Sequence, residues 1–272
     1  MAQSKRPGSR DPRRQSPRTA RREAGDPTVL YGFHPVAEAL GNPRRSFRRL
    51  LATANGAQRL TESMAALPIA PAIVRADEIS RLLEPDAVHQ GLYLEAEPLP
   101  ELSLDDLAPD ALLLVLDQVT DPHNVGAIVR TAAAFAVGAI VTTARHSPAA
   151  TGVLAKAASG GLEHVPIVTV RNLAETLIEL GRQGVWRIGL DSAGEADLAG
   201  SARPCATALV LGAEGRGLRQ RTRECCDVVA RLAMPGAIAS LNVSNAAAIA
   251  LYALTAERSR SARPTATAAT SG

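Results

Sequence analysis

The sequence predicts an α/β protein built around a parallel sheet, and three observations support this. Short apolar runs that suit buried strands alternate with helix-like segments, as in a doubly wound sheet. Hydrophobic residues make up 46% of the 272 residues and aromatics only 3%, so the core is expected to consist of Ala, Leu, Val and Ile. No apolar run reaches the roughly 18 residues that a membrane span requires.

The chain is expected to begin with a disordered basic tail at 1–27. Residues 1–25 carry eight Arg or Lys against two acidic residues, a charge of +6, whereas the whole chain is +3 and the remainder therefore −3. A Pro/Ser/Arg segment of this kind is too polar to collapse, and it attracts polyanions through counterion release. A solvated arm with no required partner is the alternative. The tail has no apolar segment of the kind found in secretory signals.

A small first α/β unit is predicted at 28–97, because strand and helix patterns alternate there. A proline-punctuated, acidic linker is predicted to follow at 98–110. The elements expected in the first unit are a helix at 31–40, a strand at 49–53, a helix at 57–66, a strand at 72–75, a helix at 77–83 and a strand at 91–95.

A second unit is predicted at 111–257, with a disordered Ser/Ala/Thr/Pro tail at 258–272. The run 111–116 suits a strand buried on both faces of a parallel sheet. Asp121 and Pro122 then provide an N-cap and a first-turn proline for a helix to about 135. Further strands are expected at 139–142, 165–170, 185–190, 206–211 and 227–232, and further helices at 151–158, 173–181, 218–225 and 242–256.

The three cysteines, Cys205, Cys225 and Cys226, form neither a disulfide framework nor a zinc pattern. They are expected to be small thiols in a reducing cytoplasm, and neither a metal nor a membrane partner is expected.

Three segments carry the residues expected to do chemistry. The segment 211–217 follows an apolar strand with the glycine spacing G-x-x-G-x-G, which suits either a tight turn or backbone lying against a ligand. This spacing differs from the dinucleotide fingerprint and disfavours a nucleotide-dependent oxidoreductase. The segment 234–245 offers more hydroxyls and amides than capping of the next helix requires. The third segment, 117–130, places Asn124 in the first turn of its helix, six residues before Arg130.

These segments resemble the three motifs of the SpoU/TrmH family of RNA ribose 2′-O-methyltransferases, in the family's order and spacing, over about 111–256. The motifs are Asp121-Pro122-His123-Asn124-Val125-Gly126 with Arg130, Leu211-Gly212-Ala213-Glu214-Gly215 with Gly217, and Ser240-Leu241-Asn242-Val243-Ser244. The first unit also resembles the RNA-binding domain of the branch that modifies a guanosine of bacterial large-subunit rRNA. The residues that fit this branch are Tyr31-Gly32, His89-Gln90-Gly91, Lys156, Gly160, Glu163, His164 and Pro166.

The resemblance implies S-adenosylmethionine as cofactor, a homodimer, and a C-terminal segment threaded through a loop as a deep trefoil knot. Such a knot is an exception to the general rule that chains avoid knots. By position in the motifs, the residues expected to present backbone to the cofactor are Gly212, Leu232 and Leu241. The expected catalytic and orienting set is Asn124, Arg130, Glu214, Ser240 and Asn242.

The role that the resemblance implies for Arg130 is to accept the proton of the ribose hydroxyl. A ribose 2′-hydroxyl must be held in line with the carbon–sulfur bond of the donor and must lose its proton. The family assigns proton acceptance to this arginine, yet a guanidinium normally stays charged in proteins. Arg130 as the literal base would therefore need a strongly perturbed site or a phosphate relay. Glu214 is expected to fix its guanidinium through a bidentate pair.

The predicted function is therefore methyl transfer to a ribose 2′-hydroxyl of structured RNA, with a guanosine of large-subunit rRNA expected as the target and the cytoplasm as location. A tRNA ribose methyltransferase is the alternative within the family. A binding-only ribosome assembly factor on the same fold is an alternative of another class, which the presence of Asn124, Arg130, Glu214 and Asn242 disfavours.

Overall fold

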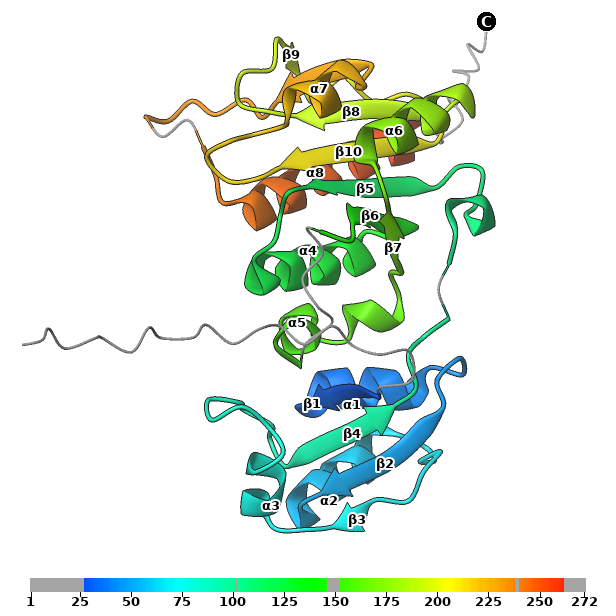
Figure 1. Cartoon of the computed structure of the whole chain (residues 1–272), viewed down its shortest axis with the longest axis vertical. Helices are drawn as coiled ribbons and strands as arrows, with labels where there is room; N and C mark the ends of the chain where they lie inside the picture. Colours follow the sequence, from blue (N-terminus) through cyan, green and yellow to red (C-terminus); the bar gives the residue numbers. More distant parts are fainter. Residues whose placement is uncertain (1–26, 101, 146–151, 238–239, 262–272) are drawn as a thin grey trace, which may run out of the picture.

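The computed structural model describes residues 27–100, 102–145, 152–237 and 240–261. These residues form a four-stranded and a seven-stranded sheet (Figure 1). The helices α1 (Phe33–Gly41) and α5 (Gly152–Ala158) contact each other between the two sheets. No helix of the described residues is long and apolar enough to cross a membrane. Residues 1–26 of the predicted disordered tail lie outside the described residues.

The N-terminal sheet has the strand order β1-β4-β2-β3. β4 is antiparallel to β1 and to β2, whereas β2 and β3 are parallel. Its remaining elements are β1 (Thr28–Tyr31), β2 (Phe47–Ala52), α2 (Ala54–Ser63), β3 (Ala72–Ile73), α3 (Ala76–Ser80) and β4 (Leu92–Ala96). Strands and helices alternate here as the sequence predicts, except that β1, four residues long, was not predicted.

The second sheet has the order β7-β6-β5-β10-β8-β11-β9, and all of its neighbouring strands are parallel. Its strands are β5 (Leu112–Asp117), β6 (Ala139–Thr143), β7 (Ile167–Val170), β8 (Trp186–Leu190), β9 (Ala196–Asp197), β10 (Thr207–Gly212) and β11 (Val228–Arg231). The accompanying helices are α4 (Pro122–Ala134), α6 (Leu173–Arg182), α7 (Gln220–Glu224), α8 (Val243–Ser261) and the short 3₁₀ turns η1 (Leu104–Asp106) and η2 (Gly161–Glu163). The predicted parallel sheet is therefore present.

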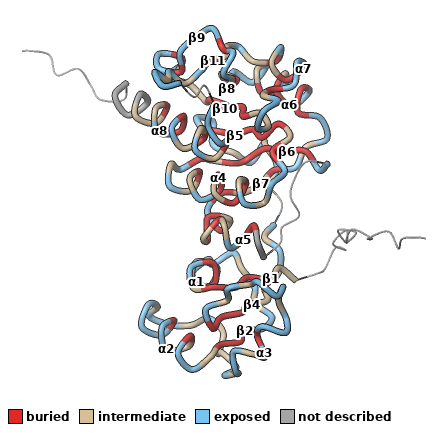
Figure 2. The backbone as a smooth tube through the Cα atoms, turned by 90° about the vertical axis from the view of Figure 1, so that its left-hand side faces the viewer, coloured by how far each residue is buried: buried red, intermediate tan, exposed pale blue. Residues whose placement is uncertain are grey.

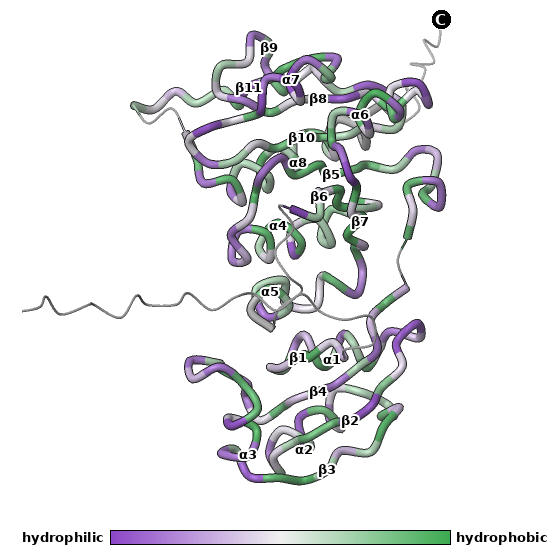
Figure 3. Tube along the Cα trace, viewed as in Figure 1, coloured by the Kyte–Doolittle hydropathy of each residue, from purple (hydrophilic) through white to green (hydrophobic). Residues whose placement is uncertain are grey.

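The alternation of side chains along β5 explains why helices cover both faces of this sheet. Leu112, Leu114 and Leu116 pack in one core with residues of α4, α5 and α8, whereas Leu113 and Val115 pack in a second core with residues of α6. All five side chains are buried. In the figures, β5 is largely red, the colour of buried residues, in Figure 2, and largely green, the colour of hydrophobic residues, in Figure 3. Burying one such side chain contributes about 1.5–3 kcal/mol relative to leaving it exposed.

The start of α4 agrees with the expected capping. The carboxylate of Asp121 accepts a hydrogen bond from the N–H of His123 at 3.0 Å, and Pro122 is the first helical residue. A proline at this position needs no donor and has its φ angle preset for the helix. The cap fixes where α4 begins and thereby places Asn124 in its first turn.

The stretch 98–110, predicted to be a linker, contains η1; Leu104 of η1 and the following Leu107 pack against the core that includes α6. Two expectations need correction. Helix α7 begins later than predicted, because Arg219 is held in an extended conformation as its N-cap. Helix α8 continues to Ser261, into the segment expected to be disordered, and the rest of that tail lies outside the described residues.

Candidate functional site

The loops that follow four neighbouring strands meet at one edge of the second sheet. β5, β10, β8 and β11 lie side by side and run in the same direction, so their carboxyl ends share that edge. Ligands of open α/β sheets bind in the crevice outside the carboxyl ends of the strands. The segment after β10 is the glycine-rich one that the sequence singles out.

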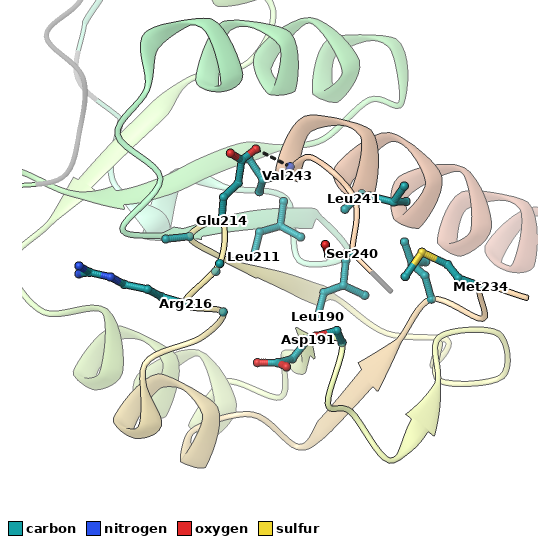
Figure 4. A pocket seen from close by; sticks show the side chains of 16 residues that line it. Leu190, Asp191, Leu211, Glu214, Arg216, Met234, Ser240, Leu241 and Val243 are labelled. Atoms are coloured by element: carbon teal, nitrogen blue, oxygen red, sulfur yellow. Dashed lines mark hydrogen bonds between the residues drawn. The ribbon is translucent and has the colours of Figure 1, made fainter. Parts of the chain in front are cut away.

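A cavity of about 380 Å³ lies at this edge, within the range of roughly 300–1,000 Å³ usual for small-molecule sites (Figure 4). Its walls combine aliphatic side chains with polar groups, which include the carboxylates of Asp191 and Glu214. Figure 4 shows Arg216 extending away from the other labelled side chains. The lining includes Leu190, Asp191, Leu211, Gly212, Glu214, Arg216, Leu232, Met234, Ser240, Leu241 and Val243.

The segment from Gly212 to Gly217 is a tight turn that forms one wall of the cavity. Gly215 and Gly217 have φ angles of 74° and 64°, which residues other than glycine rarely adopt. A Cβ on Gly212 would lie 2.2 Å from the carbonyl carbon of Gly217, because the returning chain runs directly against it. The N–H of Gly217 donates to the carbonyl of Ala213 at 2.9 Å and closes the turn. The turn thus presents bare backbone to the cavity.

The side chains of Asn124, Glu214 and Asn242 form one hydrogen-bonded group, here called the Glu214 cluster. Oε1 of Glu214 accepts from Nδ2 of Asn242 at 2.7 Å, from Nδ2 of Asn124 at 3.3 Å and from the N–H of Val243 at 3.1 Å. Nδ2 of Asn242 also donates to Oδ1 of Asn124 at 3.0 Å. The cluster joins α4, the loop after β10 and the start of α8, so the three predicted segments do converge.

Asn242 also caps α8. Its Oδ1 accepts from the N–H of Ser244 at 2.9 Å and from the hydroxyl of Ser244 at 2.6 Å. The carboxylate of Glu214, bound to the N–H of Val243, lies where the helix dipole favours negative charge. Part of this polar segment therefore does cap the next helix, as the sequence allows. The capping residue, Asn242, also belongs to the Glu214 cluster.

Two further carboxylates hold the end of the glycine segment against the sheet. Asp117 is fully buried and accepts from the N–H of Arg219 at 3.1 Å and from its Nε at 2.6 Å. Asp191 accepts from the N–H of Leu218 at 3.4 Å and pairs with Arg223 at 3.3 Å. Sequence reasoning does not single out Asp191, which follows β8 outside any motif.

The predicted site residues fall into three groups. Those that line the cavity are Gly212, Glu214, Leu232, Ser240 and Leu241. Asn124 and Asn242 stand beside it, bound to Glu214. Arg130 is exposed on α4 and is not among the lining residues. The expected ion pair between Arg130 and Glu214 is not formed, because Glu214 binds two amides and a backbone N–H instead.

The described residues give no support for a metal site or for a cysteine nucleophile. They contain no group of three or more His, Cys, Asp or Glu side chains placed to hold a metal ion. Burial raises the pKa of Cys226 to about 12, so its thiol stays protonated near neutral pH and is a poor nucleophile.

Glu214→Ala is expected to lower the free energy of unfolding by about 1–3 kcal/mol, because three donors, one of them a helix N–H, lose a charged acceptor. Urea denaturation measures the change. Glu224→Ala is the matched control, because Glu224 makes only exposed contacts within its own helix: a pair with Arg221 at 3.7 Å and a hydrogen bond from Nε2 of Gln220 at 3.1 Å. The control should change stability by less than about 0.5 kcal/mol. Equal effects of the two substitutions would show that the Glu214 cluster adds no stability.

Comparison with known proteins finds two family models that together cover most of the chain. Residues 111–252 match the SpoU rRNA Methylase family. Residues 29–102 match the model named RNA 2'-O ribose methyltransferase substrate binding. The Glu214 cluster and all the cavity residues named above lie within the first match.

Bacterial proteins of related sequence carry one shared description. The 23S rRNA (guanosine-2'-O-)-methyltransferase RlmB of Ralstonia nicotianae is 40% identical over 239 residues, which cover 85% of this chain and 96% of the relative. The protein of the same description from Pseudomonas aeruginosa is 39% identical, covering 84% and 96%.

Solved structures share the fold. The SpoU methyltransferase AviRb from Streptomyces viridochromogenes, in complex with the cofactor AdoMet, has a TM-score of 0.70 at 24% identity and covers 86% of this chain and 91% of its own. The AdoMet-bound rRNA methyltransferase from Sinorhizobium meliloti has a TM-score of 0.70 at 22% identity, covering 85% and 88%.

Proposed function

Because the chain belongs to the SpoU rRNA methylase family, we propose that the three converging segments transfer a methyl group from S-adenosylmethionine to a ribose 2′-hydroxyl of RNA. The observation that carries this function is the Glu214 cluster, which brings side chains of all three family segments together beside a cavity of suitable size.

The substrate is large-subunit rRNA, and the modified nucleotide is a guanosine. Both relatives described above are named as 23S rRNA guanosine methyltransferases and align with this chain over almost their whole length. We assign RNA binding to the unit at 28–97, which the substrate-binding model overlaps, and catalysis to the unit at 111–257. The tRNA alternative has no comparable support in these relatives.

The residues of the cavity fit S-adenosylmethionine. Leu190, Leu211 and Leu241 would provide aliphatic surface for the adenine ring, and the bare backbone of Gly212 would allow close approach. The carboxylates of Asp191 and Glu214 give this region negative charge, which suits a ligand with a sulfonium and an ammonium group. When bound, the cofactor supplies an electrophilic methyl group that needs no metal ion.

The chain's own residues then have two tasks: to orient the ribose and to help its hydroxyl lose a proton as the oxygen–carbon bond forms and the carbon–sulfur bond breaks. Asn124 and Asn242 are held in fixed orientation by Glu214. We assign ribose positioning to Ser240, whose exposed side chain lies at the cavity. We assign to Arg130 a role at the ribose 2′-hydroxyl. It would either accept the proton of this hydroxyl or provide a fixed positive charge beside the developing oxyanion.

We also propose a homodimer and a knotted C-terminal segment. Arg130 is outside the lining of its own chain's cavity, which favours a site to which a second copy contributes this residue. Ile249 and Tyr252 of α8 are 47% and 66% exposed, an apolar surface that suits a partner copy. The knot is supported by Leu232, Met234, Ser240 and Leu241, which share the cavity wall with the turn after β10. We also infer a cytoplasmic location, because the relatives are described as 23S rRNA methyltransferases.

The purified chain is expected to methylate unmodified 23S rRNA transcribed in vitro when S-adenosylmethionine labelled in its methyl group is supplied. Nuclease digestion and mass spectrometry should recover the label as 2′-O-methylguanosine at a single position. Equal amounts of bulk tRNA provide the competing substrate. Label in tRNA alone would replace rRNA by the tRNA alternative, and binding of rRNA without any label would favour the assembly-factor function.

A further inference from the structure

A buried ion pair joins the N-terminal sheet unit to the second sheet unit. Arg45, in the turn between α1 and β2, contacts Glu163 of η2 through Nη2 and Oε1 at 2.8 Å. The side chains are only 4% and 2% exposed. Nε of Arg45 also donates to Oε1 and Oε2 of Glu163, at 3.2 and 3.0 Å. Removing one partner of such a pair leaves the other charge buried without compensation, which is far more costly than losing an exposed pair.

Neighbouring donors complete the coordination of Glu163. Nδ2 of Asn42 donates to Oε2 of Glu163 at 2.8 Å, and Nη2 of Arg44 donates to its backbone carbonyl at 3.1 Å. Nη1 of Arg45 donates in turn to the carbonyl of Glu97, where the chain leaves β4. One carboxylate thus collects donors from a single turn of the N-terminal unit.

A second contact supports the same junction. Gly160 has a φ angle of 89°, and a Cβ there would lie 2.3 Å from Cγ of Glu38 in α1. Nε2 of His164 lies 2.9 Å from Oε2 of Glu38, with the two side chains 58% and 47% exposed. The N-terminal unit therefore docks on η2 through a buried centre with an exposed rim.

The docked segment packs directly on the helix that carries the catalytic candidates. A Cβ on Gly161 would lie 3.0 Å from the carbonyl oxygen of Val129 and 3.2 Å from Cα of Arg130. A Cβ on Gly126 of α4 would lie 2.3 Å from Cβ of Ala157 in α5, so these two helices are also closely packed. Figure 1 shows α5 between α1 and α4. The segment that holds Glu163 is therefore in direct backbone contact with α4 at Arg130, so a shift at the junction would also move Arg130.

We propose that Glu163 is a positioning residue for methyl transfer: its buried pair with Arg45 fixes the RNA-binding unit relative to α4, so that bound RNA presents its target ribose to the site. The inference rests on the proposed function. The alternative is an RNA-binding unit that is free to move on its linker. A fixed junction makes RNA affinity and methyl transfer separable, because an undocked unit still grips RNA but delivers the ribose to the wrong place.

Glu163→Gln is the first test, with Glu179→Gln as its control, since Glu179 pairs with Arg182 on the exposed surface of α6, outside the RNA-binding unit and the cavity lining. Glu163→Gln should lower the single-turnover methylation rate on 23S rRNA by about 10- to 100-fold. Dissociation constants for RNA and for S-adenosylmethionine should stay within about twofold, because the side chain of Glu163 is only 2% exposed and does not line the cavity. Glu179→Gln should leave all three values unchanged.

A covalent link tests positioning against a general loss of structure. Glu38→Cys and His164→Cys, joined by a short bismaleimide in a chain carrying Cys205→Ser and Cys226→Ser, hold the two units together. In the Glu163→Gln background the cross-link should restore most of the lost rate. Should Glu163→Gln fail to fold, Asn42→Ala, which keeps the ion pair but removes the 2.8 Å donor, takes its place with a smaller loss and the same rescue.

The possible outcomes separate the inference from the function on which it rests. Wild-type methylation together with an unchanged rate for Glu163→Gln would overturn the positioning role and leave the methyltransferase intact. A folded variant whose losses in rate and in cofactor affinity are equal, and which the cross-link does not rescue, would also overturn it. A wild-type chain that does not methylate RNA would count against the function itself.

Discussion

Arg130→Ala is expected to slow methyl transfer to 23S rRNA by about 10²- to 10⁴-fold, the usual contribution of a group that assists proton transfer. Affinity for S-adenosylmethionine should stay within about twofold, because Arg130 does not line the cavity of its own chain. Single-turnover transfer of a labelled methyl group measures the first value, and isothermal titration calorimetry measures the second. The combination of a lost rate and a retained cofactor is the signature of a residue that acts on the RNA hydroxyl.

Two further variants sharpen the result for Arg130. Arg171→Ala removes an exposed arginine at the end of β7 and should leave the rate unchanged. Arg130→Lys keeps the positive charge but loses the planar, bidentate guanidinium. If charge alone assists the reaction, the lysine variant should retain much of the rate; if guanidinium geometry is needed, it should be as slow as the alanine variant. Unimpaired methylation by Arg130→Ala would reject the catalytic assignment.

Gly212→Ala is expected to weaken S-adenosylmethionine binding by on the order of 10- to 100-fold, because one added methyl group has no room in the turn. Its Cβ would lie 2.2 Å from the carbonyl carbon of Gly217 and 2.5 Å from the nitrogen of Leu218, and these neighbours are backbone atoms. The turn must therefore move, and the wall of the cavity moves with it. Calorimetric titration of the purified variant with the cofactor gives the affinity.

Gly41→Ala is the matched control for Gly212→Ala. Gly41 ends α1 and does not have a positive φ angle, and a Cβ there would meet no atom of another segment within 4 Å. Alanine there should leave cofactor binding unchanged, and the better helix propensity of alanine makes a loss of stability unexpected. Cofactor affinity that survives in Gly212→Ala would mean that the turn opposite the Leu241 segment is not the binding wall.

Local signals in the sequence predict the elements of the second sheet well. The unbroken apolar run of β5 and the Asp121–Pro122 pair at the start of α4 each determine one element without reference to distant residues. The two-residue strand β9 has no such signal, because a pattern of period two cannot be recognised in two residues. The helix α7 is predicted too early, because Arg219 is bound to a carboxylate 102 positions away.

The candidate site shows the same division. Grouping Asn124, Glu214 and Asn242 was possible from the motifs, and the structure joins them by hydrogen bonds. The partner of Glu214 was predicted wrongly, because opposite charge suggested Arg130 while the start of α8 supplied nearer donors. Neither Asp191 at the cavity nor the buried pair of Glu163 could be predicted, since both depend on contacts between distant segments.

The pairing of β5 with β10 has a consequence for how the chain reaches its native state. Leu112 is aligned with Thr207, so the two central strands are separated by almost a hundred residues of sequence. At a synthesis rate of about 5–20 residues per second, β5 waits roughly 5–20 s for its partner. During that interval an apolar strand edge is open to wrong pairing, and such non-local contacts also make folding intrinsically slow. Nascent chains are therefore expected to be most prone to aggregation before β10 has been made.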